Sequence, residues 1–298
     1  MTYAAIPEGA VLVGVENWPE AAESVSWAAE QAFRAGRDMC LFHVVSAATL
    51  DTPPGFRAGA PSEPEQDYGA TVLAGASSYA DRRLEELSRA PRFAGHRRPE
   101  VSVELAAGSV GHVLAAASPH ASLLVLGSRG RGPIRSRILG SVGRATVKDA
   151  RCPVVVLRPG GGGVGRGVLV GIDGTGDSIP ALEFAFEQAD QRNLPLTVLY
   201  CYRAGGPAGS DDDRALVAEC VAGLRERYPD LNPRLRIHSG SLAHVLAEQS
   251  RTMHMVVIGG RGGTAGHLLD HAHCVVGVVP SDYSRDSRAD TTPPVAAR

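Results

Sequence analysis

The chain contains two copies of one pattern, and this internal repeat constrains the fold more than any other feature of the sequence. Residues 9–17, GAVLVGVEN, return as RGVLVGIDG at residues 166–174, and each apolar run ends in an acidic residue. Further along, GSVGHVLAAASPHASLLVLGSRG at residues 108–130 returns as GSLAHVLAEQSRTMHMVVIGGRG at residues 240–262. Since the matching segments keep their order over the length of a domain, the sequence predicts an internal duplication.

Within each copy, apolar runs suited to buried strands alternate with amphipathic helical patterns. The runs MCLFHVV at residues 39–45 and LTVLYCY at residues 196–202 are counterparts, and helices are predicted over residues 19–36 and 178–194. Strands that alternate with helices at this period predict a doubly wound α/β fold, which is a parallel sheet covered by helices on both faces. Such sheets bind ligands at the carboxyl ends of the strands, near the point where the strand order reverses.

We therefore predict two tandem doubly wound domains. A chain of 298 residues is long enough for two, and a content of 44% hydrophobic but only 5% aromatic residues fits α/β packing of small side chains. The predicted domains are residues 1–159 and residues 167–280. A glycine-rich joint at residues 160–166 separates them, and a polar tail at residues 281–298 is expected to be disordered.

Charge and cysteine content narrow the classes of partner. The formal net charge of −2 provides no general attraction to nucleic acid or to an acidic membrane surface, and no apolar run approaches the ~20 residues of a membrane span. The five cysteines are odd in number and lack closely spaced pairs, which indicates reduced thiols. We expect a cytoplasmic protein with neither nucleic acid nor a membrane as its partner.

A glycine motif indicates a phosphate-binding loop. Gly127, Gly130, Gly140 and Ser141 follow the spacing G-x2-G-x9-G-S after the apolar run at residues 123–126. Glycine lets the backbone turn its N–H groups toward an anion without obstruction by a Cβ atom. The Gly-Ser pair opens a helical pattern whose first N–H groups and positive dipole end favour phosphate, and the Ser hydroxyl can cap the helix or bind a phosphate oxygen. Arginines nearby supply guanidinium groups that suit phosphate oxygens: Arg129, Arg131, Arg135 and Arg137.

The sequence lacks two other nucleotide-binding motifs. Lys148, the only lysine, lies inside a helical pattern and not in the Gly-Lys-Ser/Thr sequence of a Walker-type ATPase. The residues after Val13 read GVENWP and contain no G-x-G-x-x-G, which disfavours a nicotinamide-dependent dehydrogenase.

The segments GSRG at residues 127–130, LGSV at residues 139–142 and RCPV at residues 151–154 resemble the universal stress protein family. The resemblance implies an ATP-binding member, with Mg2+ beside the phosphates, in which the glycines and the serine line the phosphates. It also implies that the acidic residue after the first strand contacts the nucleotide, and that backbone groups near the end of the second strand border the adenine. Carried to this sequence, the site comprises Gly14, Val15, Glu16, Val44, Gly127, Ser128, Arg129, Gly130, Arg131, Gly140, Ser141 and Val142. Glu16 stands where the family usually carries aspartate.

The second copy keeps only part of this motif. Asp173 matches Glu16, and Gly259 and Gly262 begin a glycine-rich loop. However, about ten residues that would correspond to the start of the LGSVGRATVK helix are missing, and no Gly-Ser pair follows. Without a second helix N-terminus we expect weak or no ATP binding in this domain, and therefore one nucleotide per chain. The alternative is that the shortening truncates a helix covering the second sheet and so destabilises that sheet.

Four histidines and one cysteine are candidates for other functions. His267, His271, His273 and Cys274 have the spacing of metal ligands, but the family carries a similar stretch before its last strand without metal, so no metal site is predicted. His43 lies on a predicted strand and is expected to be a core histidine with a satisfied hydrogen bond.

The proline- and glycine-rich segment at residues 46–69 precedes a helix predicted from residue 70. A mobile surface loop is the expected structure. A lid over the nucleotide is the alternative, because the loop after the second strand lies near the binding edge in this architecture.

A binding module is the function that fits these features best. We expect the first domain to hold ATP and to transmit the bound state to a protein partner or to its own assembly, with the two copies packed through their last strands and a further homodimer. The sequence shows no nucleophile beside a base, so at most slow ATP hydrolysis is expected. One alternative is an enzyme that uses ATP for group transfer. The other is an interaction protein that binds no nucleotide, which is favoured if Glu16 blocks the adenine pocket.

Overall fold

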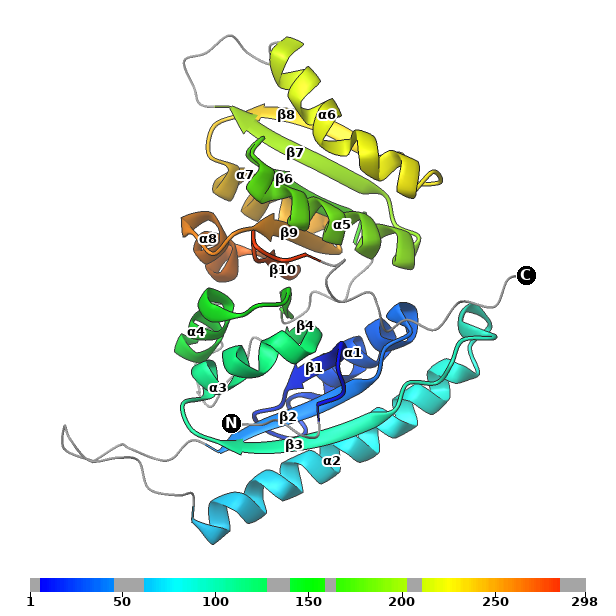
Figure 1. Cartoon of the computed structure of the whole chain (residues 1–298), viewed down its shortest axis with the longest axis vertical. Helices are drawn as coiled ribbons and strands as arrows, with labels where there is room; N and C mark the ends of the chain where they lie inside the picture. The colour runs from blue at the N-terminus through cyan, green and yellow to red at the C-terminus, as the bar shows by residue number, and fades with distance from the viewer. Residues whose placement is uncertain (1–5, 46–61, 128–139, 159–164, 203–210, 285–298) are drawn as a thin grey trace, which may run out of the picture.

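Ten strands form a single sheet that runs through the whole molecule (Figure 1). The computed structural model describes residues 6–45, 62–127, 140–158, 165–202 and 211–284. Within these residues the strand order is β3-β2-β1-β4-β5-β10-β9-β6-β7-β8. Neighbouring strands are parallel except β5 and β10, which are antiparallel. The predicted doubly wound α/β class is therefore confirmed.

The first half contributes five strands and four α-helices. Its strands are β1 (Ala10–Gly14), β2 (Met39–Val45), β3 (Val101–Ala107), β4 (Ala121–Leu126) and β5 (Val154–Val156). Its helices are α1 (Ala22–Ala35), α2 (Glu63–Ser88), α3 (Val110–Ala117) and α4 (Ser141–Asp149).

The second half repeats the same order of elements. Its strands are β6 (Val168–Ile172), β7 (Leu196–Tyr202), β8 (Arg234–Ser239), β9 (Met255–Gly259) and β10 (Val275–Val279). Its helices are α5 (Ile179–Arg192), α6 (Asp211–Arg227), α7 (Leu242–Gln249) and α8 (Gly263–His271). Among the described helices, none is long and apolar enough to cross a lipid bilayer.

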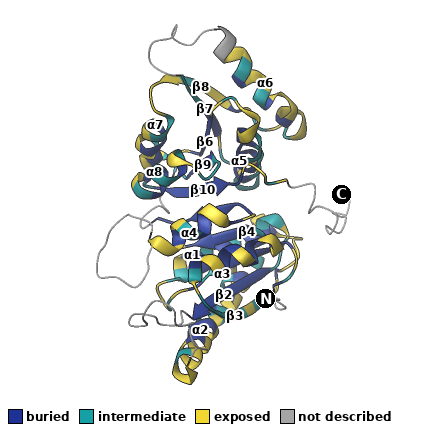
Figure 2. Ribbon diagram, turned by 60° about the vertical axis from the view of Figure 1, so that its left-hand side comes forward, coloured by how far each residue is buried: buried dark blue, intermediate teal, exposed yellow. Residues whose placement is uncertain are grey.

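The sheet separates two apolar cores, because successive side chains of a strand point to opposite faces. Val11 and Val13 join the core under α1 and α2, whereas Leu12 joins the core under α3 and α4. Each core continues from the first half into the second. Figure 2 shows the strands as a buried layer between helices whose outer faces are exposed.

The two halves meet through their last strands, as predicted. Val155 of β5 pairs with Gly277 of β10, and these two residues are equivalents in the repeat. The pairing places a pseudo-two-fold axis at this point and makes the strands of the two halves antiparallel to each other. A Cβ at position 277 would lie 3.1 Å from a ring carbon of Phe184, so glycine lets α5 pack closely over β10.

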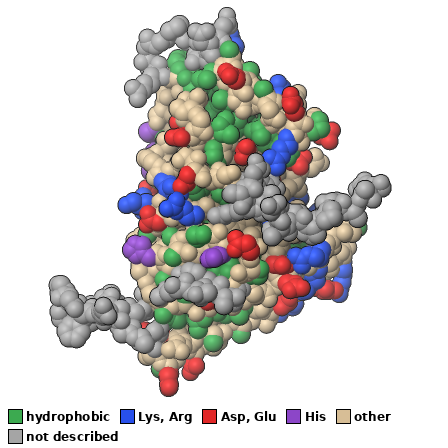
Figure 3. Space-filling view, viewed as in Figure 1, with side chains coloured by type: hydrophobic (Ala, Val, Ile, Leu, Met, Phe, Trp, Pro, Cys, Tyr) green, Lys and Arg blue, Asp and Glu red, His purple; other side chains and the backbone are tan. Residues whose placement is uncertain are grey.

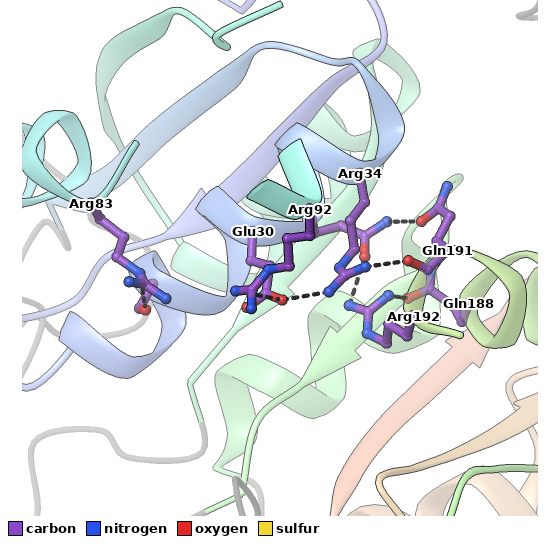
Figure 4. Close-up of polar contacts among 9 residues, drawn as sticks. Glu30, Arg34, Arg83, Arg92, Gln188, Gln191 and Arg192 are labelled. Atoms are coloured by element: carbon purple, nitrogen blue, oxygen red, sulfur yellow. Dashed lines mark hydrogen bonds and ion pairs between the residues drawn. The ribbon is translucent and has the colours of Figure 1, made fainter. Parts of the chain in front are cut away.

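Polar contacts between α1 and α5 reinforce the same boundary (Figure 4). Gln31 Nε2 donates to Gln191 Oε1 at 3.0 Å, and Arg192 donates to Gln31 Oε1 at 2.7 Å. Arg34 donates to the backbone carbonyl of Gln191, which lies in the last turn of α5. The halves are therefore joined by strand pairing, by apolar cores and by helix contacts. The predicted glycine-rich joint, of which residues 160–164 lie outside the described residues, does not leave them independent.

The structure corrects the predicted limits of two segments. Residues 63–69, expected in a loop, are the first turns of α2, and Ser62 starts this helix with a backbone N–H that donates to Glu65 Oε2 at 2.8 Å. The rest of that segment, residues 46–61, lies outside the described residues. At the other end, residues 281–284 of the expected disordered tail are described, and Asp282 makes ion pairs with Arg151 and Arg261.

The prediction of a truncated helix in the second half was wrong. Helix α8 contains nine residues, as α4 does, and it buries Leu268 and Leu269 against the sheet. The difference in length lies in the loop before the helix, since residues 128–140 separate Gly127 from α4 but only residues 260–262 separate Gly259 from α8. A sheet face without its helix would expose apolar surface, so the loop is the part that can be shortened.

Candidate functional site

The candidate site lies where the strand order of the first half reverses. Strand β1 pairs with β2 on one side and with β4 on the other, so its carboxyl end marks the switch point of the sheet. Gly14 and Leu126, the last residues of β1 and β4, are register partners. The chain continues outward from β1 with Val15, whose N–H donates to Phe42 O at 2.9 Å.

Two predicted site residues face the same side of the sheet at this edge. A Cβ at Gly14 would lie 2.8 Å from a methyl carbon of Leu126 and 3.6 Å from a methyl carbon of Leu114 in α3. Val44, near the end of β2, belongs to the same apolar core as Leu114. A flat ligand at this edge would therefore meet backbone at Gly14 and an aliphatic side chain at Val44.

The N-terminus of α4 lies at the same edge because it packs against the start of α3. Gly111 is the second residue of α3, which follows the carboxyl end of β3. A Cβ at Gly111 would lie 2.7 Å from Ala145 Cβ and 3.1 Å from Val142 O, both in α4. This close approach holds the first turn of α4 beside the strand ends.

The first turn of α4 is open to solvent and free of acidic side chains. Gly140 is the N-cap residue, Ser141 begins the helix, and both are exposed. Val142 is 41% exposed. The first N–H groups of a helix have no partner within the helix, so these groups and the helix dipole can bind an anion.

Gly127, directly after β4, completes the described part of the glycine motif. A Cβ at this position would lie 3.1 Å from Ser24 Oγ in α1, so a larger residue would crowd the start of that helix. Glu16 is exposed and follows Val15. The structure thus brings eight of the predicted site residues to one edge: Gly14, Val15, Glu16, Val44, Gly127, Gly140, Ser141 and Val142. The other predicted residues lie outside the described residues: Ser128, Arg129, Gly130 and Arg131.

Two residues at this edge were missed in the sequence. Tyr68 OH donates to Asn17 Oδ1 at 2.8 Å, and the Tyr68 ring lies edge-on to His43 with 6.3 Å between ring centroids. The signal that could have found Tyr68 is Ser62-x-x-Glu65, a capping box that places it on a helix and not in a loop. His43 itself is buried with Nδ1 2.7 Å from Val15 O, which confirms the expected core histidine.

The glycines at the equivalent edge of the second half have similarly close neighbours. A Cβ at Gly171, the counterpart of Gly14, would lie 2.6 Å from a methyl carbon of Leu246 and 3.1 Å from one of Leu242. Two leucines therefore occupy the space beside this glycine. Gly259 is also covered, since a Cβ there would lie 3.1 Å from Asp177 O.

Asp173, the predicted acidic residue of the second site, is used by its own loop. Its Oδ1 accepts hydrogen bonds from Ser178 Oγ at 2.7 Å, from Thr175 Oγ1 at 2.7 Å and from Thr175 N at 2.9 Å. Burial favours the neutral carboxyl, but these hydrogen bonds outweigh it and lower the pKa of Asp173. Gly262 is the N-cap residue of α8, and a Cβ at this position would meet no atom within 4 Å.

Histidine rings of α7 and α8 lie together in the second half, whereas Cys274 is buried. His267 and His271 stack with 4.2 Å between ring centroids, and His244 lies 4.6 Å from His267. Cys274 is buried, and burial raises the pKa of its thiol to about 12. Within the described ranges, no group of three or more His, Cys, Asp or Glu side chains is placed to hold a metal ion.

These features define a class of protein: tandem doubly wound α/β repeats that share one sheet, with a glycine-bordered helix N-terminus at the switch point of the first repeat. Comparison with known proteins narrows the class. The family model described as the universal stress protein family matches residues 9–158 and 166–280. The chain belongs to this family.

Relatives and solved structures agree with this assignment. A universal stress protein of Mycolicibacterium smegmatis is 31% identical over 98% of this chain and 97% of its own length. One from Mycobacterium tuberculosis is 30% identical over 87% of this chain and 89% of its own length. The crystal structure of a universal stress protein from Archaeoglobus fulgidus covers 94% of this chain and 98% of its own, with a TM-score of 0.64 and 17% identity.

Some solved family members hold nucleotides. A universal stress protein from Archaeoglobus fulgidus is in complex with dAMP, and another universal stress protein is in complex with cAMP. Each covers about half of this chain, 50% and 51%, with TM-scores of 0.34 and 0.35.

Proposed function

We propose that the first half of this universal stress protein binds ATP and that the second half binds none. The observation that carries the proposal is the convergence of Gly14, Val44, Gly127 and the open N-terminus of α4 on one edge, at the switch point of the sheet. In the second half, the carboxylate of Asp173 is hydrogen-bonded within its own loop, and no Gly-Ser pair precedes α8. This contrast supports one nucleotide per chain.

Each part of the site suits one part of ATP. The first-turn N–H groups of α4 and the Ser141 hydroxyl would bind phosphate oxygens. Val44 would border the adenine, and the exposed carboxylate of Glu16 would accept from the ribose or the base. Mg2+ would be held mainly by the phosphates, because the first turn of α4 contains no acidic side chain. Bound there, it would neutralise phosphate charge.

We further propose that the protein acts as a binding module in stress signalling. ATP occupancy would be transmitted to a protein partner or to a homo-oligomer. The five cysteines are all free thiols, which supports a place in the reducing cytoplasm. On the face seen in Figure 3, acidic and basic side chains lie interspersed in small groups, which gives no support to a nucleic-acid partner.

A pair of matched variants tests the proposal. Gly140 and Gly262 are the N-cap residues of α4 and α8, and a Cβ at either position meets no atom within 4 Å, so a tryptophan should fit at both without disturbing the fold. We expect one ATP per chain in the parent, both by mass analysis of co-purified nucleotide and by calorimetric titration with Mg2+. Gly140→Trp should weaken ATP binding at least about tenfold, which corresponds to 1.4 kcal/mol, whereas Gly262→Trp should leave it unchanged.

Three outcomes would contradict the proposal. A parent that binds no ATP would favour a nucleotide-free interaction protein. Equal loss of binding in Gly140→Trp and Gly262→Trp, or two ATP per chain, would contradict the assignment to the first half. Rapid multiple turnover with an acceptor substrate would make the protein an enzyme of group transfer.

A further inference from the structure

Helix α4 is held along its length by the second half of the chain. It lies beside α8 across the boundary between the halves (Figure 1, Figure 2). In the first turn of α4, Arg144 forms an ion pair with Asp270 of α8. At the other end, Arg261 donates to Ala150 O, directly after the last turn of α4, at 2.6 Å. These contacts come from an element of the other repeat.

Asp282 adds a bridge at the same end of α4. Its two carboxylate oxygens pair with Arg151 at 3.1 Å and with Arg261 at 3.2 Å. Arg151 follows Ala150, and Asp282 follows β10, so the bridge ties the end of α4 to the last strand of the second half. The C-terminal end of α8 is tied in return by Arg158 of the first half, which is buried and donates to Leu269 O.

Arg261 has a different role from its counterpart in the glycine motif. It aligns with Arg129, which the sequence places in the phosphate loop of the first half. In the second half the guanidinium group of Arg261 contacts Ala150 O and Asp282 and so contacts the other repeat. Arg261 therefore joins the loop before α8 to the end of α4.

We propose that the second half positions α4 for the phosphates of ATP, with Arg144, Asp270, Arg261 and Asp282 as positioning residues. The proposal rests on the proposed function, because it assigns the phosphates to the first turn of α4. Within the first half, the described contacts of this helix are mainly with α3, where Gly111 leaves no space for a Cβ. The contacts with α8 and Asp282 fix its other side.

Coupling of this kind is reciprocal. If the contacts with the second half hold α4 in the geometry that binds phosphate, bound phosphate must stabilise those contacts by the same free energy. The second half would therefore sense whether the nucleotide carries phosphates, although it binds no nucleotide itself. The affinity for adenosine, which has no phosphate to reach α4, should not depend on these contacts.

The comparison of ATP with adenosine tests the proposal. In the full chain, Asp282→Asn removes both ion pairs of the bridge at an exposed position, and Arg144→Gln removes the pair with Asp270. We expect each variant to bind ATP about five- to tenfold more weakly by calorimetric titration and to bind adenosine with the affinity of the parent. Arg144→Lys keeps the charge and should recover part of the loss. Asp81→Asn on α2 removes an exposed ion pair with Arg98. This variant is the matched control and should change neither affinity.

Hydrogen–deuterium exchange of the parent gives the reciprocal measurement. ATP should slow exchange in residues 263–271, and adenosine should not. If the variants bind ATP as tightly as the parent, the positioning role is overturned while the proposed function stands. If they lose ATP and adenosine alike, the contacts are merely structural, and the proposal is again overturned. If the parent binds adenosine but not ATP, or binds neither, both proposals fail.

Discussion

Single residues distinguish the two repeats at the places where a ligand would approach. Gly14 and Gly171 are equivalent, and aliphatic side chains lie against both: Leu126 and Leu114 at Gly14, and Leu246, Leu242 and Ile258 at Gly171. Gly111 faces α4 at a distance that excludes a Cβ, whereas the second half carries Ala243 at the matching position. The helix pair beside the binding edge therefore accommodates a Cβ at this position only in the second repeat.

Replacing Gly111 by alanine should destabilise the protein, although alanine favours helix more than glycine does. The new Cβ would lie 2.7 Å from Ala145 Cβ, so α3 and α4 must separate. We expect a loss of about 1–3 kcal/mol in the free energy of unfolding, measured in urea. Gly223→Ala on the exposed face of α6 is the matched control, because nothing lies within 4 Å, and it should stabilise by about 0.5–1 kcal/mol. Equal effects of the two changes would show that the contact between α3 and α4 is not tight.

His267 should make the protein less stable in mild acid. Burial lowers the pKa of His267 below 6.5, His271 and His244 lower it further, and Asp270 opposes them. The unfolded chain therefore binds a proton more readily than the folded protein, so the stabilisation present above pH 6.5 declines as pH falls toward the lower folded pKa.

The variant His267→Gln cannot be protonated at this position. It should lose less free energy of unfolding than the parent between about pH 7.5 and about pH 5.5, as measured by urea unfolding at both pH values. Equal losses in the parent and the variant would exclude His267 as a source of the acid sensitivity.

At the scale of elements, the sequence predicted the buried and strongly patterned segments best. Strands β2 and β7 lie where the apolar runs placed them, and α5 ends with Asn193 in the left-handed conformation at φ 52°. Strands β3 and β8 were not predicted. They form the two edges of the sheet and carry polar residues among their apolar ones, so neither contains a continuous apolar run like those of β2 and β7.

The length of the second repeat shows why alignment alone did not locate the deletion. The letters after Gly262 match neither a loop nor a helix start of the first repeat, so the sequence could not say which one had been shortened. The structure locates the deletion in the loop, because Leu268 and Leu269 of α8 are buried and the helix is kept to cover the sheet. The candidate site could be predicted as a set of residues because the family motif marks them. The contacts of Arg261 and Asp282 could not be predicted from the sequence, because they join segments whose proximity depends on how the two halves pack.

Arg158 should stabilise α8 through its C-terminal carbonyls. The side chain is buried, and its guanidinium group donates to Leu269 O and lies 3.5 Å from Leu268 O. Leu268 O also accepts from Ala272 N at 2.9 Å, so Arg158→Met would remove the Arg158 donor chiefly from Leu269 O, at a cost of about 1–3 kcal/mol in the free energy of unfolding. Arg98→Met, which removes an exposed ion pair with Asp81, should cost less than about 1 kcal/mol in the same urea titration. Similar losses in the two variants would contradict the capping role.

At the scale of the whole molecule, the two repeats share their sheet and both of their cores. The strand pair β5–β10 closes the edge that each repeat would otherwise expose, and apolar side chains of both halves meet on each face of the sheet. An unpaired strand edge attracts other chains, so neither repeat is complete without the other. This continuity is also what would let the second half act on α4.

The chain should therefore unfold as one unit. Both tryptophans, Trp18 and Trp27, lie in the first half, so their fluorescence reports that half, whereas far-ultraviolet circular dichroism reports the helices of both. Trp27 also lies 4.9 Å from the guanidinium carbon of Arg192 in α5, which extends the shared boundary. We expect the two signals to give coincident urea transitions, because separating the halves would expose both cores at once. Fluorescence that changes at a different urea concentration from circular dichroism would show that the halves unfold separately, and the second half could then not hold α4 in place.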